Sequence, residues 1–406
     1  MLKAGSLYYS LIIVILVGTI IGALVLNTGT HQTFRKRSEL NSELVETCTN
    51  GIKYGLAFYD ELTTNKETVD IFENSKKVSL YKERWGGFNL LFCESFLKNE
   101  KIRKTAIIGN YEKNSFALYL PDLDRPLLLS GKSTIYGDCK LPNEGVSSTF
   151  IDGVNSNSSE KLVVGRVLKS EKKLPKLALD IASVFEDFHN LDYESILEKG
   201  FLKNEFNNLP VIVDMNEVID LENIVISGKV IIQSQDSINI RKTAKLENII
   251  IKSPKVYIEN GFIGSIQIIA SSDVYIDENV TLKYPSFITL ENNDNTIQAK
   301  VSISPNSNIL GGILLYGKTS SEYQNQLIID ENVLVAGNIY CNGETQLKGK
   351  IKGSIYTNRF FLNTDESEYN NVILNGSIDN INLPEKFVRI NFIEGKEANY
   401  EIIKWL

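Results

Sequence analysis

The first strong feature of the hydropathy pattern is an uncharged apolar stretch from Leu7 to Leu26. It contains 20 residues. An α-helix of that length, rising about 1.5 Å per residue, spans about 30 Å, the thickness of a bilayer's hydrocarbon core. The stretch is longer than the apolar core of a cleavable signal peptide, and no Ala-x-Ala site follows it. We therefore predict an uncleaved transmembrane anchor bounded by Leu7 and Leu26.

Helical spacing continues beyond this stretch. From about residue 30 to residue 60 the chain has no proline, and apolar residues recur at intervals of three or four positions. These positions are Leu40, Leu44, Val45, Cys48, Ile52 and Leu56. We expect the anchor to continue as a long amphipathic helix, with Gly51 and Gly55 as its weak points.

A different periodicity, of 18 residues, marks the C-terminal half. The segments that begin at Ser237, Lys255 and Asp273 can be laid over one another without gaps. Four apolar columns keep the spacing: Ile238, Val256 and Val274; Ile240, Ile258 and Ile276; Ala244, Phe262 and Val280; and Ile251, Ile269 and Phe287. One unit cannot bury its apolar face alone, whereas stacked units close a common core. We predict a solenoid whose core holds these columns.

Each unit alternates apolar and polar residues, as strands with one buried face do. Three short strands of roughly five or six residues each fit such a coil. Polar residues would turn the corners, because Ile276-Asp-Glu-Asn-Val280 recurs as Ile329-Asp-Glu-Asn-Val333. A Gly-[Ser/Asn]-Ile unit recurs at Gly264, Gly337, Gly353 and Gly376. Calcium binding needs oxygens that converge, so we interpret the acidic copies as corner turns rather than as a metal site.

The predicted fold class is therefore mainly β, and the length of 406 residues suits two or three domains. We divide the chain into a transmembrane and amphipathic helix (1–60), an irregular antiparallel β domain (61–175), a helical connector (176–210), a parallel β-helix (211–395) and a C-terminal cap (396–406). Within the second part, Leu128 to Cys139 has small residues spaced like a solenoid turn. The connector is predicted as a helix from Leu179, Ile181, Val184, Phe185 and Phe188.

Composition limits the chemistry. The net charge of −7 argues against a general nucleic-acid binder, since phosphate contacts need clustered basic side chains. The four cysteines, Cys48, Cys93, Cys139 and Cys341, form no CxxC, so we expect no zinc site. They are either free thiols or, in an exported protein, disulfides, with Cys93 and Cys139 as the pair to test. Only His31 and His189 are present, and we predict no cofactor.

An apolar N-terminal helix that runs into an amphipathic one resembles the N-terminus of type IV pilins, and especially of minor pilins or K-type minor pseudopilins. Gly5 precedes the apolar run, as a prepilin-peptidase site requires, although the leader is very short. Ser10 stands where most pilins carry a glutamate, which the K-type proteins also lack. The resemblance covers about 60 residues and implies a body outside the cytoplasmic membrane. The basic residues Arg35, Lys36 and Arg37 favour the opposite orientation.

The repeat resembles the bactofilins, the bacterial polymer-forming proteins with a right-handed β-helix of short coils. The best match runs from Val333 to Gly343 and from Gly349 to Thr357, within a region of roughly 220–380. Bactofilins lack a long N-terminal part and polymerise through exposed β-helix ends. Here another domain precedes the repeat, and we expect the tail after Asn382, with Phe387 and Trp405, to cap the last coil and block such growth.

These features predict a non-enzymatic, single-pass inner-membrane protein of a bacterial envelope assembly. Its expected partners are the lipid bilayer and other proteins, possible pilin-like subunits among them, and an oligomer fits this role. The first alternative is a cytoplasmic, membrane-tethered scaffold of bactofilin type. The second is a β-helix that binds or degrades polysaccharide, although no column repeats paired carboxylates at the coil period.

Overall fold

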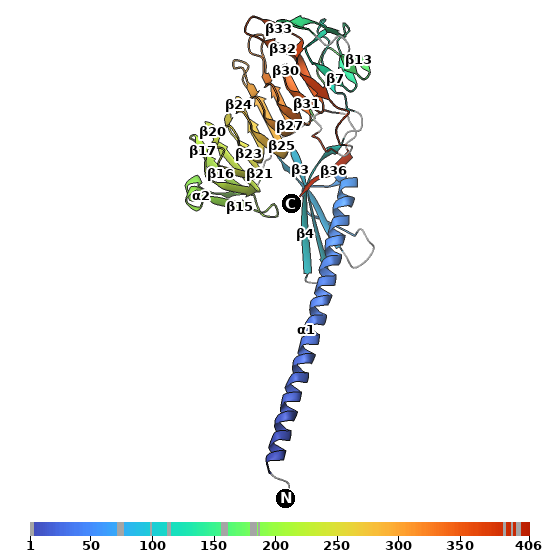
Figure 1. The fold of residues 1–406 in the computed structure, drawn as a ribbon, viewed down its shortest axis with the longest axis vertical. Coiled ribbons are helices and arrows are strands. Elements are labelled where there is room, and N and C mark those ends of the chain that lie inside the picture. Colours follow the sequence, from blue (N-terminus) through green and yellow to red (C-terminus); the bar gives the residue numbers. More distant parts are fainter. Residues whose placement is uncertain are drawn as a thin grey trace. The chain divides into compact units, whose positions relative to one another are not determined.

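The computed structural model describes residues 4–70, 77–97, 100–111, 115–155, 161–178, 185, 187–384, 387–390, 393–394 and 399–406. The described chain is mainly β, with one long N-terminal helix (Figure 1). It divides into two compact units: Met1–Lys82 with Leu91–Lys104, and Glu83–Leu90 with Thr105–Leu406.

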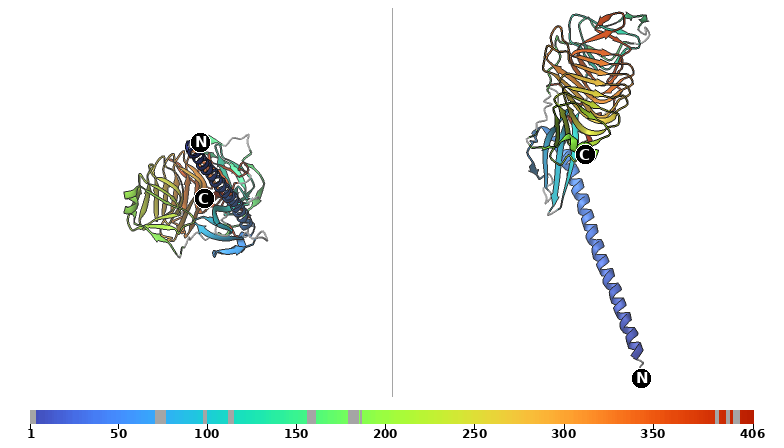
Figure 2. Two further views of the ribbon diagram at one scale, coloured as in Figure 1. Left: turned by 90° about the horizontal axis from the view of Figure 1, so that it is seen from below. Right: turned by 90° about the vertical axis from the view of Figure 1, so that its left-hand side faces the viewer.

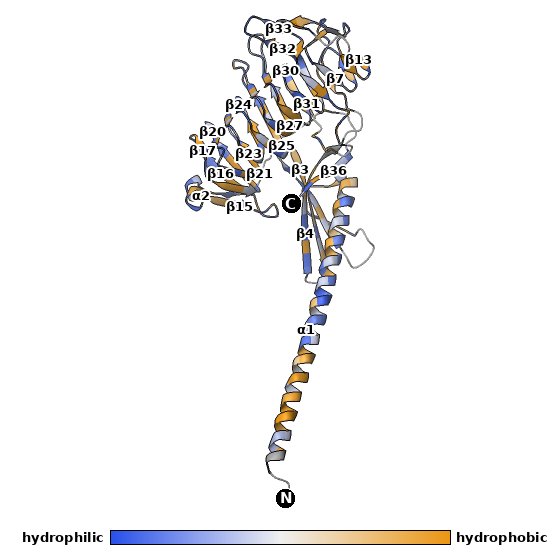
Figure 3. Cartoon of the chain, viewed as in Figure 1, coloured by the Kyte–Doolittle hydropathy of each residue, from blue (hydrophilic) through white to orange (hydrophobic). Residues whose placement is uncertain are grey.

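The helix α1 (Ala4–Ala57) carries the apolar stretch in its first half. That half is long and apolar enough to cross a membrane, and its large apolar side chains are exposed. Figure 3 shows the apolar turns followed by hydrophilic ones. Farther along, Leu44, Cys48 and Ile52 are buried on one face at intervals of four residues. The helix therefore continues without a break from the apolar stretch into a packed segment, as its residue spacing predicts.

Gly51 and Gly55 are contact points rather than weak points of α1. A Cβ at Gly55 would lie 3.1 Å from the side chain of Leu91, and one at Gly51 would lie 2.6 Å from Cys93 Sγ. The missing side chains allow the strand that carries these residues to approach the helix closely. A 3-10 turn (Tyr59–Glu61) follows α1.

The strands that follow α1 form a five-stranded sheet in the order β1-β2-β3-β4-β36. Their bounds are β1 (Glu67–Val69), β2 (Lys77–Trp85), β3 (Phe88–Leu97), β4 (Glu100–Tyr111) and β36 (Asn399–Trp405). β1 pairs with β2, and β36 with β4, in antiparallel register. The tail is therefore not a cap on the last coil, as 396–406 was predicted to be: its alternating residues complete the edge of this sheet instead.

The second unit is built on a 26-stranded sheet whose repeat pairings are parallel, an arrangement that fits a solenoid (Figure 2). The first strands are β14 (His189–Asn190), β15 (Phe201–Asn204), β16 (Val211–Met215), β17 (Ile219–Leu221), β18 (Val225–Gly228), β19 (Val230–Ser234), β20 (Ser237–Ile240), β21 (Lys245–Lys252), β22 (Lys255–Ile258), β23 (Ile263–Ala270), β24 (Asp273–Ile276) and β25 (Thr281–Asn292).

The repeat continues through β26 (Lys300–Ile303), β27 (Asn308–Gly317), β28 (Gln326–Ile329), β29 (Leu334–Ala336), β30 (Ile339–Leu347), β31 (Lys350–Lys352), β32 (Ile355–Asn363), β33 (Glu368–Asn370), β34 (Val372–Leu374) and β35 (Ser377–Asp379). Successive strands stack in three rows, seen in the series β17–β20–β22–β24, β15–β18–β21–β23 and β16–β19–β21–β23. Three strands per turn therefore agree with the expectation from the repeat length.

The first two apolar columns pair in the sheet. Ile238, Val256 and Val274 are consecutive partners, and so are Ile240, Ile258 and Ile276. All six side chains are at most 2% exposed, and the third column, Ala244, Phe262 and Val280, is buried in the same core. The 18-residue period therefore records the distance between stacked strands.

The fourth column was wrong. Ile251 pairs with Ile268, which in turn pairs with Ile288, whereas Ile269 pairs with Lys252. The cause is a register shift between Glu247 and Ile249, where Asn248 takes a φ of 58°. Beyond this bulge each strand lies one residue out of the simple period.

The sequence order of the coils is broken at the far end of the sheet. Residues 118–169, predicted as irregular antiparallel structure, pair in parallel with the C-terminal coils: β35 with β7 (Thr134–Tyr136), β34 with β6 (Leu127–Ser130), and β32 with β5 (Leu118–Tyr119). Further strands stack on these: β8 (Cys139–Leu141), β9 (Val146–Ser148), β12 (Val163–Val164) and β13 (Val167–Lys169), with a separate hairpin of β10 (Phe150–Ile151) and β11 (Val154–Asn155). The expected solenoid turn at Leu128–Cys139 lies in these coils.

The connector is less helical than expected. Its only helix among the described residues is α2 (Tyr193–Lys199), preceded by the short strand β14. Leu179, Ile181 and Val184, on which the longer helix was predicted, lie outside the described residues. Tyr193 and Ile196 of α2 are buried in the core of the repeat. Gly200, with a φ of 71°, ends the helix and leads into β15.

Candidate functional site

The predicted residues divide into two kinds in the structure. Leu7 and Leu26 are 78% and 72% exposed on α1, as an anchor in contact with lipid requires. The nine column residues, by contrast, are buried in the core and can hold no ligand. They position surface groups, so any site in this unit must be sought on its outer faces.

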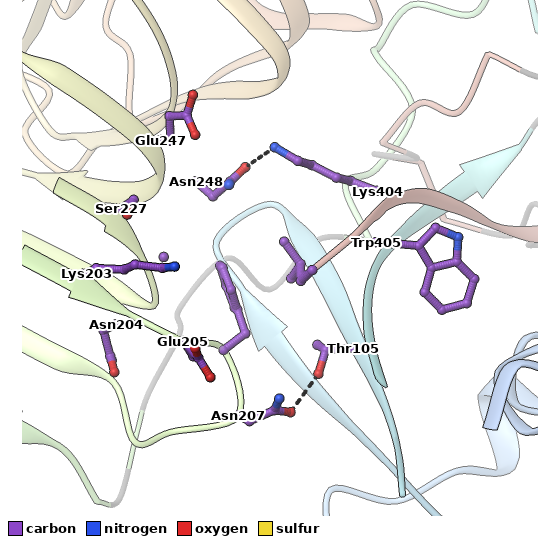
Figure 4. Close-up of a pocket in the computed structure, with 13 residues that line it drawn as sticks. Thr105, Lys203, Asn204, Glu205, Asn207, Ser227, Glu247, Asn248, Lys404 and Trp405 are labelled. Carbon is purple, nitrogen blue, oxygen red and sulfur yellow. Dashed lines mark hydrogen bonds between the residues drawn. The ribbon is translucent and has the colours of Figure 1, made fainter. Parts of the chain in front are cut away.

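The candidate site is an open groove of about 480 Å³ in the second unit (Figure 4). Three parts of that unit line it: β15 and the turn after it, the neighbouring strands β18 and β21, and the end of β36 with Thr105. The lining residues are Thr105, Lys203, Asn204, Glu205, Phe206, Asn207, Ser227, Gly228, Glu247, Asn248, Lys404, Trp405 and Leu406.

One wall is a column of outward side chains from three stacked strands. Lys203 pairs with Ser227, and Ser227 pairs with Glu247. Because the serine side chain is small, it leaves space between a cation and an anion at either end of the column. Lys203 and Glu247 are both exposed. Within the described part of the chain neither has an ion pair or a side-chain hydrogen bond, so both charges are available to a ligand.

The opposite wall is fastened to the coils by hydrogen bonds. Lys404 Nζ donates to Asn248 Oδ1 at 3.0 Å, and Thr105 Oγ1 donates to Asn207 Oδ1 at 2.9 Å. Asn248 is the bulge residue, so the register shift described above also presents this amide to the groove. Phe206 is buried at the base, where its ring meets Trp85 edge-to-face at 5.4 Å.

This arrangement supplies separated positive and negative charges, amides and a hydroxyl above an aromatic base. Such a lining can bind a zwitterionic or peptide-like segment by ion pairing and hydrogen bonding. The sequence contained no motif for it, because Lys203 and Lys404 are 201 residues apart. Only the pairing of β15, β18 and β21 brings the charged residues into one column.

A second cluster consists of Asp122, Asp124 and Glu144, whose carboxylate oxygens lie within 4.8 Å of one another. Carboxylates are suitable ligands for Ca²⁺ or Mg²⁺. However, Asp122 Oδ1 already accepts from the backbone N–H of Asp124 at 3.1 Å, and its other oxygen accepts from the Asn143 amide. These bonds make the cluster a turn-stabilising arrangement. It is separate from the repeated Ile-Asp-Glu-Asn-Val segments.

Those segments are corner turns. Asn279 and Asn332, the fourth residues of the two copies, have φ values of 57° and 58°. Asparagine tolerates this left-handed conformation better than most residues. In the looser copy, Gly261 takes the same position with a φ of 81°.

The cysteines do not form the predicted pair. All four are buried free thiols, and Cys93 and Cys139 belong to different units. Cys139 and Cys341 lie in the core of the repeat, where burial raises the pKa of Cys139 to about 12 and that of Cys341 to about 11. Cys93 lies instead beside Cys48 of α1, whose Sγ is 3.0 Å from the Cys93 carbonyl oxygen.

Compared with known protein families, curated proteins and solved structures, the chain gives no match in any of the three.

Proposed function

We propose that this chain is a single-pass membrane protein that carries a right-handed parallel β-helix and serves as a structural, non-enzymatic component of a bacterial envelope assembly. The body then lies on the outer side of the inner membrane, as in a pilin-like subunit. Its partners are the bilayer and other proteins of the assembly.

The observation that carries this proposal is the continuity of α1. The helix passes from the exposed apolar stretch to Leu44, Cys48 and Ile52, which are buried against strands of the first unit. A single helix shared by anchor and fold makes the first unit's position depend on the membrane. A cleavable targeting segment would not need such packing.

The polar middle of α1 sets a distance. Residues 27–43 lie between the apolar stretch and Leu44, and all except the half-buried Leu40 are exposed. As a helix this segment is about 25 Å long. It suits a spacer that holds the first unit away from the bilayer surface, where larger assembly partners can reach it.

The last coil offers a surface for such partners. In the described part of the chain, β12 and β13 pair on one edge only, with β7 and β8. Val164, Val167 and Leu168 on these strands are 40–47% exposed. An open edge with exposed apolar side chains is a site where another chain can add a strand. The first coil differs, because α2 buries Tyr193 and Ile196 against the core.

A cytoplasmic scaffold tethered to the membrane is the first alternative, favoured by the four free thiols and by Arg35, Lys36 and Arg37. A carbohydrate-binding role is the second. Tyr257 and Tyr275 stack at 5.3 Å on the outer face of β22 and β24, and aromatic rings of this kind can contact sugars.

The assembly role is tested on the full-length chain in native membranes, solubilised in mild detergent and separated by native electrophoresis. We expect the wild type to migrate as a complex larger than the monomer, and Val167→Asp to shift it toward the monomer. Val225→Asp is the matched control, since Val225 is 45% exposed but lies on a strand paired on both edges. A wild-type chain that runs as a monomer, or equal effects of both variants, would count against the proposal.

A further inference from the structure

Two cysteines from different elements of the first unit meet in its interior. Cys48 is on α1 and Cys93 is on β3, and their side chains are 0% and 1% exposed. The Cys48 thiol donates a hydrogen bond to the Cys93 carbonyl oxygen at 3.0 Å. The sulfur of one residue thus touches the main chain of the other, three bonds from its Cβ.

The Cys93 side chain points toward the same place on the helix. Gly51 follows Cys48 by one turn of α1, and a Cβ at Gly51 would lie 2.6 Å from Cys93 Sγ. The sulfur therefore occupies the space that the glycine leaves empty. Both sulfurs approach one contact between α1 and β3, so rotation of the side chains is the main change that a bond between them requires.

Two further hydrogen bonds fix the alignment around this contact. Ser95 Oγ donates to the Leu44 carbonyl oxygen at 2.8 Å, one turn before Cys48. Lys104 Nζ donates to Thr49 Oγ1 at 2.7 Å, one residue after it. The helix is thus held against β3 and β4 on either side of the cysteine pair, and the two thiols cannot slide apart.

We propose that Cys48 and Cys93 form an intrachain disulfide when the protein folds in the presence of a disulfide donor. One thiolate attacks the donor disulfide and releases one donor thiol, which leaves a mixed disulfide. The second cysteine then displaces the other donor thiol and closes the Cys48–Cys93 bond. The two protein thiols lose two electrons and two protons, and the donor gains both as two thiols.

The timing of the reaction follows from burial. The hydrogen bond with Cys48 and the burial of its own thiol raise the pKa of Cys93, so the folded pair is poor in the reactive thiolate. Exchange therefore takes place during folding or when α1 opens locally. Once formed, the bond joins the helix that carries the apolar stretch to the sheet, and a pull on that helix reaches the sheet through covalent bonds.

The test uses the full-length chain in detergent, reduced and then incubated with a buffer of oxidised and reduced glutathione near its unfolding temperature. After acid quenching, alkylation and digestion, mass spectrometry measures the peptide pairs. We expect most of Cys48 in a peptide linked to Cys93, with Cys139 and Cys341 alkylated, and a rise of the unfolding midpoint on the order of 5 °C. Separate glutathione adducts on Cys48 and Cys93, both thiols remaining free, or another cysteine pair would overturn the proposal.

A glycine pair provides a second measurement that does not remove a thiol. Gly51→Ala places a methyl group where Cys93 Sγ lies, and we expect it to lower the yield of the linked peptide. Gly29→Ala changes the same helix at a position where a Cβ meets nothing within 4 Å, and the yield should equal that of the wild type. Equal yields from the two variants would contradict the geometry proposed here. Because these readouts are made in purified protein, they do not depend on the membrane side of the body.

Discussion

At the scale of single residues, burial separates positions that look alike in the sequence. Ile258 and Ile263 are five residues apart, yet Ile258 is 0% exposed between Ile240 and Ile276, while Ile263 is 54% exposed. The 18-residue columns predicted the first position correctly. They could not predict the fourth column, because the bulge at Asn248 depends on a backbone conformation that leaves no periodic trace.

We expect Ile258→Asp to abolish cooperative unfolding of the second unit, because a carboxylate would replace a fully buried side chain without a partner. The cost is more than about 3 kcal/mol. Ile263→Asp is the matched control and should change the free energy of unfolding little. Thermal unfolding of the full chain in detergent, followed by circular dichroism, measures both. Similar unfolding curves for Ile258→Asp and the wild type would refute the coil register.

Buried thiols and phenols should make the protein sensitive to alkali. Burial raises the pKa of Cys139 and of Tyr193 to about 12, and that of Cys341 to about 11. These groups stay protonated in the folded chain after their counterparts in the unfolded chain have lost a proton. Stability is therefore complete below the unfolded pKa values and falls as the pH rises from about 9 to 11, by about 1.4 kcal/mol per pH unit for each such group.

The measurement is the unfolding midpoint of the full chain as a function of pH. The double variant Cys139→Ala/Cys341→Ala should show a shallower decline than the wild type between pH 9 and 11, since two of the linked groups are gone. Parallel declines in the two proteins would mean that these thiols are not responsible.

At the scale of elements, local pattern predicted the helix and most of the repeat strands. The apolar stretch and the spacing of Leu44, Cys48 and Ile52 suffice for α1, since the signal lies within the helix itself. The tail was assigned wrongly as a cap, because β36 has its partner, β4, nearly 300 residues earlier. A strand's alternation predicts that it has a buried face, not which sheet it joins.

For α1, we expect Leu16→Arg to reduce the fraction of the chain that stays in membranes after carbonate extraction. Leu16 lies near the centre of the apolar stretch, where a charged residue costs about 2.5–3.5 kcal/mol. Phe34→Arg is the control: Phe34 is also exposed, at 74%, but lies beyond the stretch, so retention should not change. Full retention of Leu16→Arg would show that the stretch does not enter a bilayer.

At the scale of the whole molecule, the notable property of the second unit is that its coils are not stacked in chain order. Ser377 pairs with Thr134, Ile378 with Ile135 and Ile355 with Leu118. The sequence showed a solenoid-like spacing near Leu128 but could not show where that piece belongs, because its partners are more than 200 residues away. Closing such long loops is slow in folding.

The pairing of these coils can be tested by cross-linking. In the double variant Thr134→Cys/Ser377→Cys, the new cysteines are direct partners on parallel strands, so a short thiol cross-linker should join them. Thr134→Cys/Ser237→Cys is the control, since Ser237 lies on β20, many coils away, and should give no product. Protein digestion and mass spectrometry identify the joined peptides, and equal products in both variants would contradict the order of coils.

The central claim is that the β body stands on the outer side of an inner membrane. The most direct measurement is the protease sensitivity of a C-terminal tag in spheroplasts, with a cytoplasmic protein as the control for lysis. The proposed function predicts that the tag is digested while the control stays intact. Protection of the tag alongside the control would place the body in the cytoplasm, contradict the pilin-like role and favour the tethered scaffold.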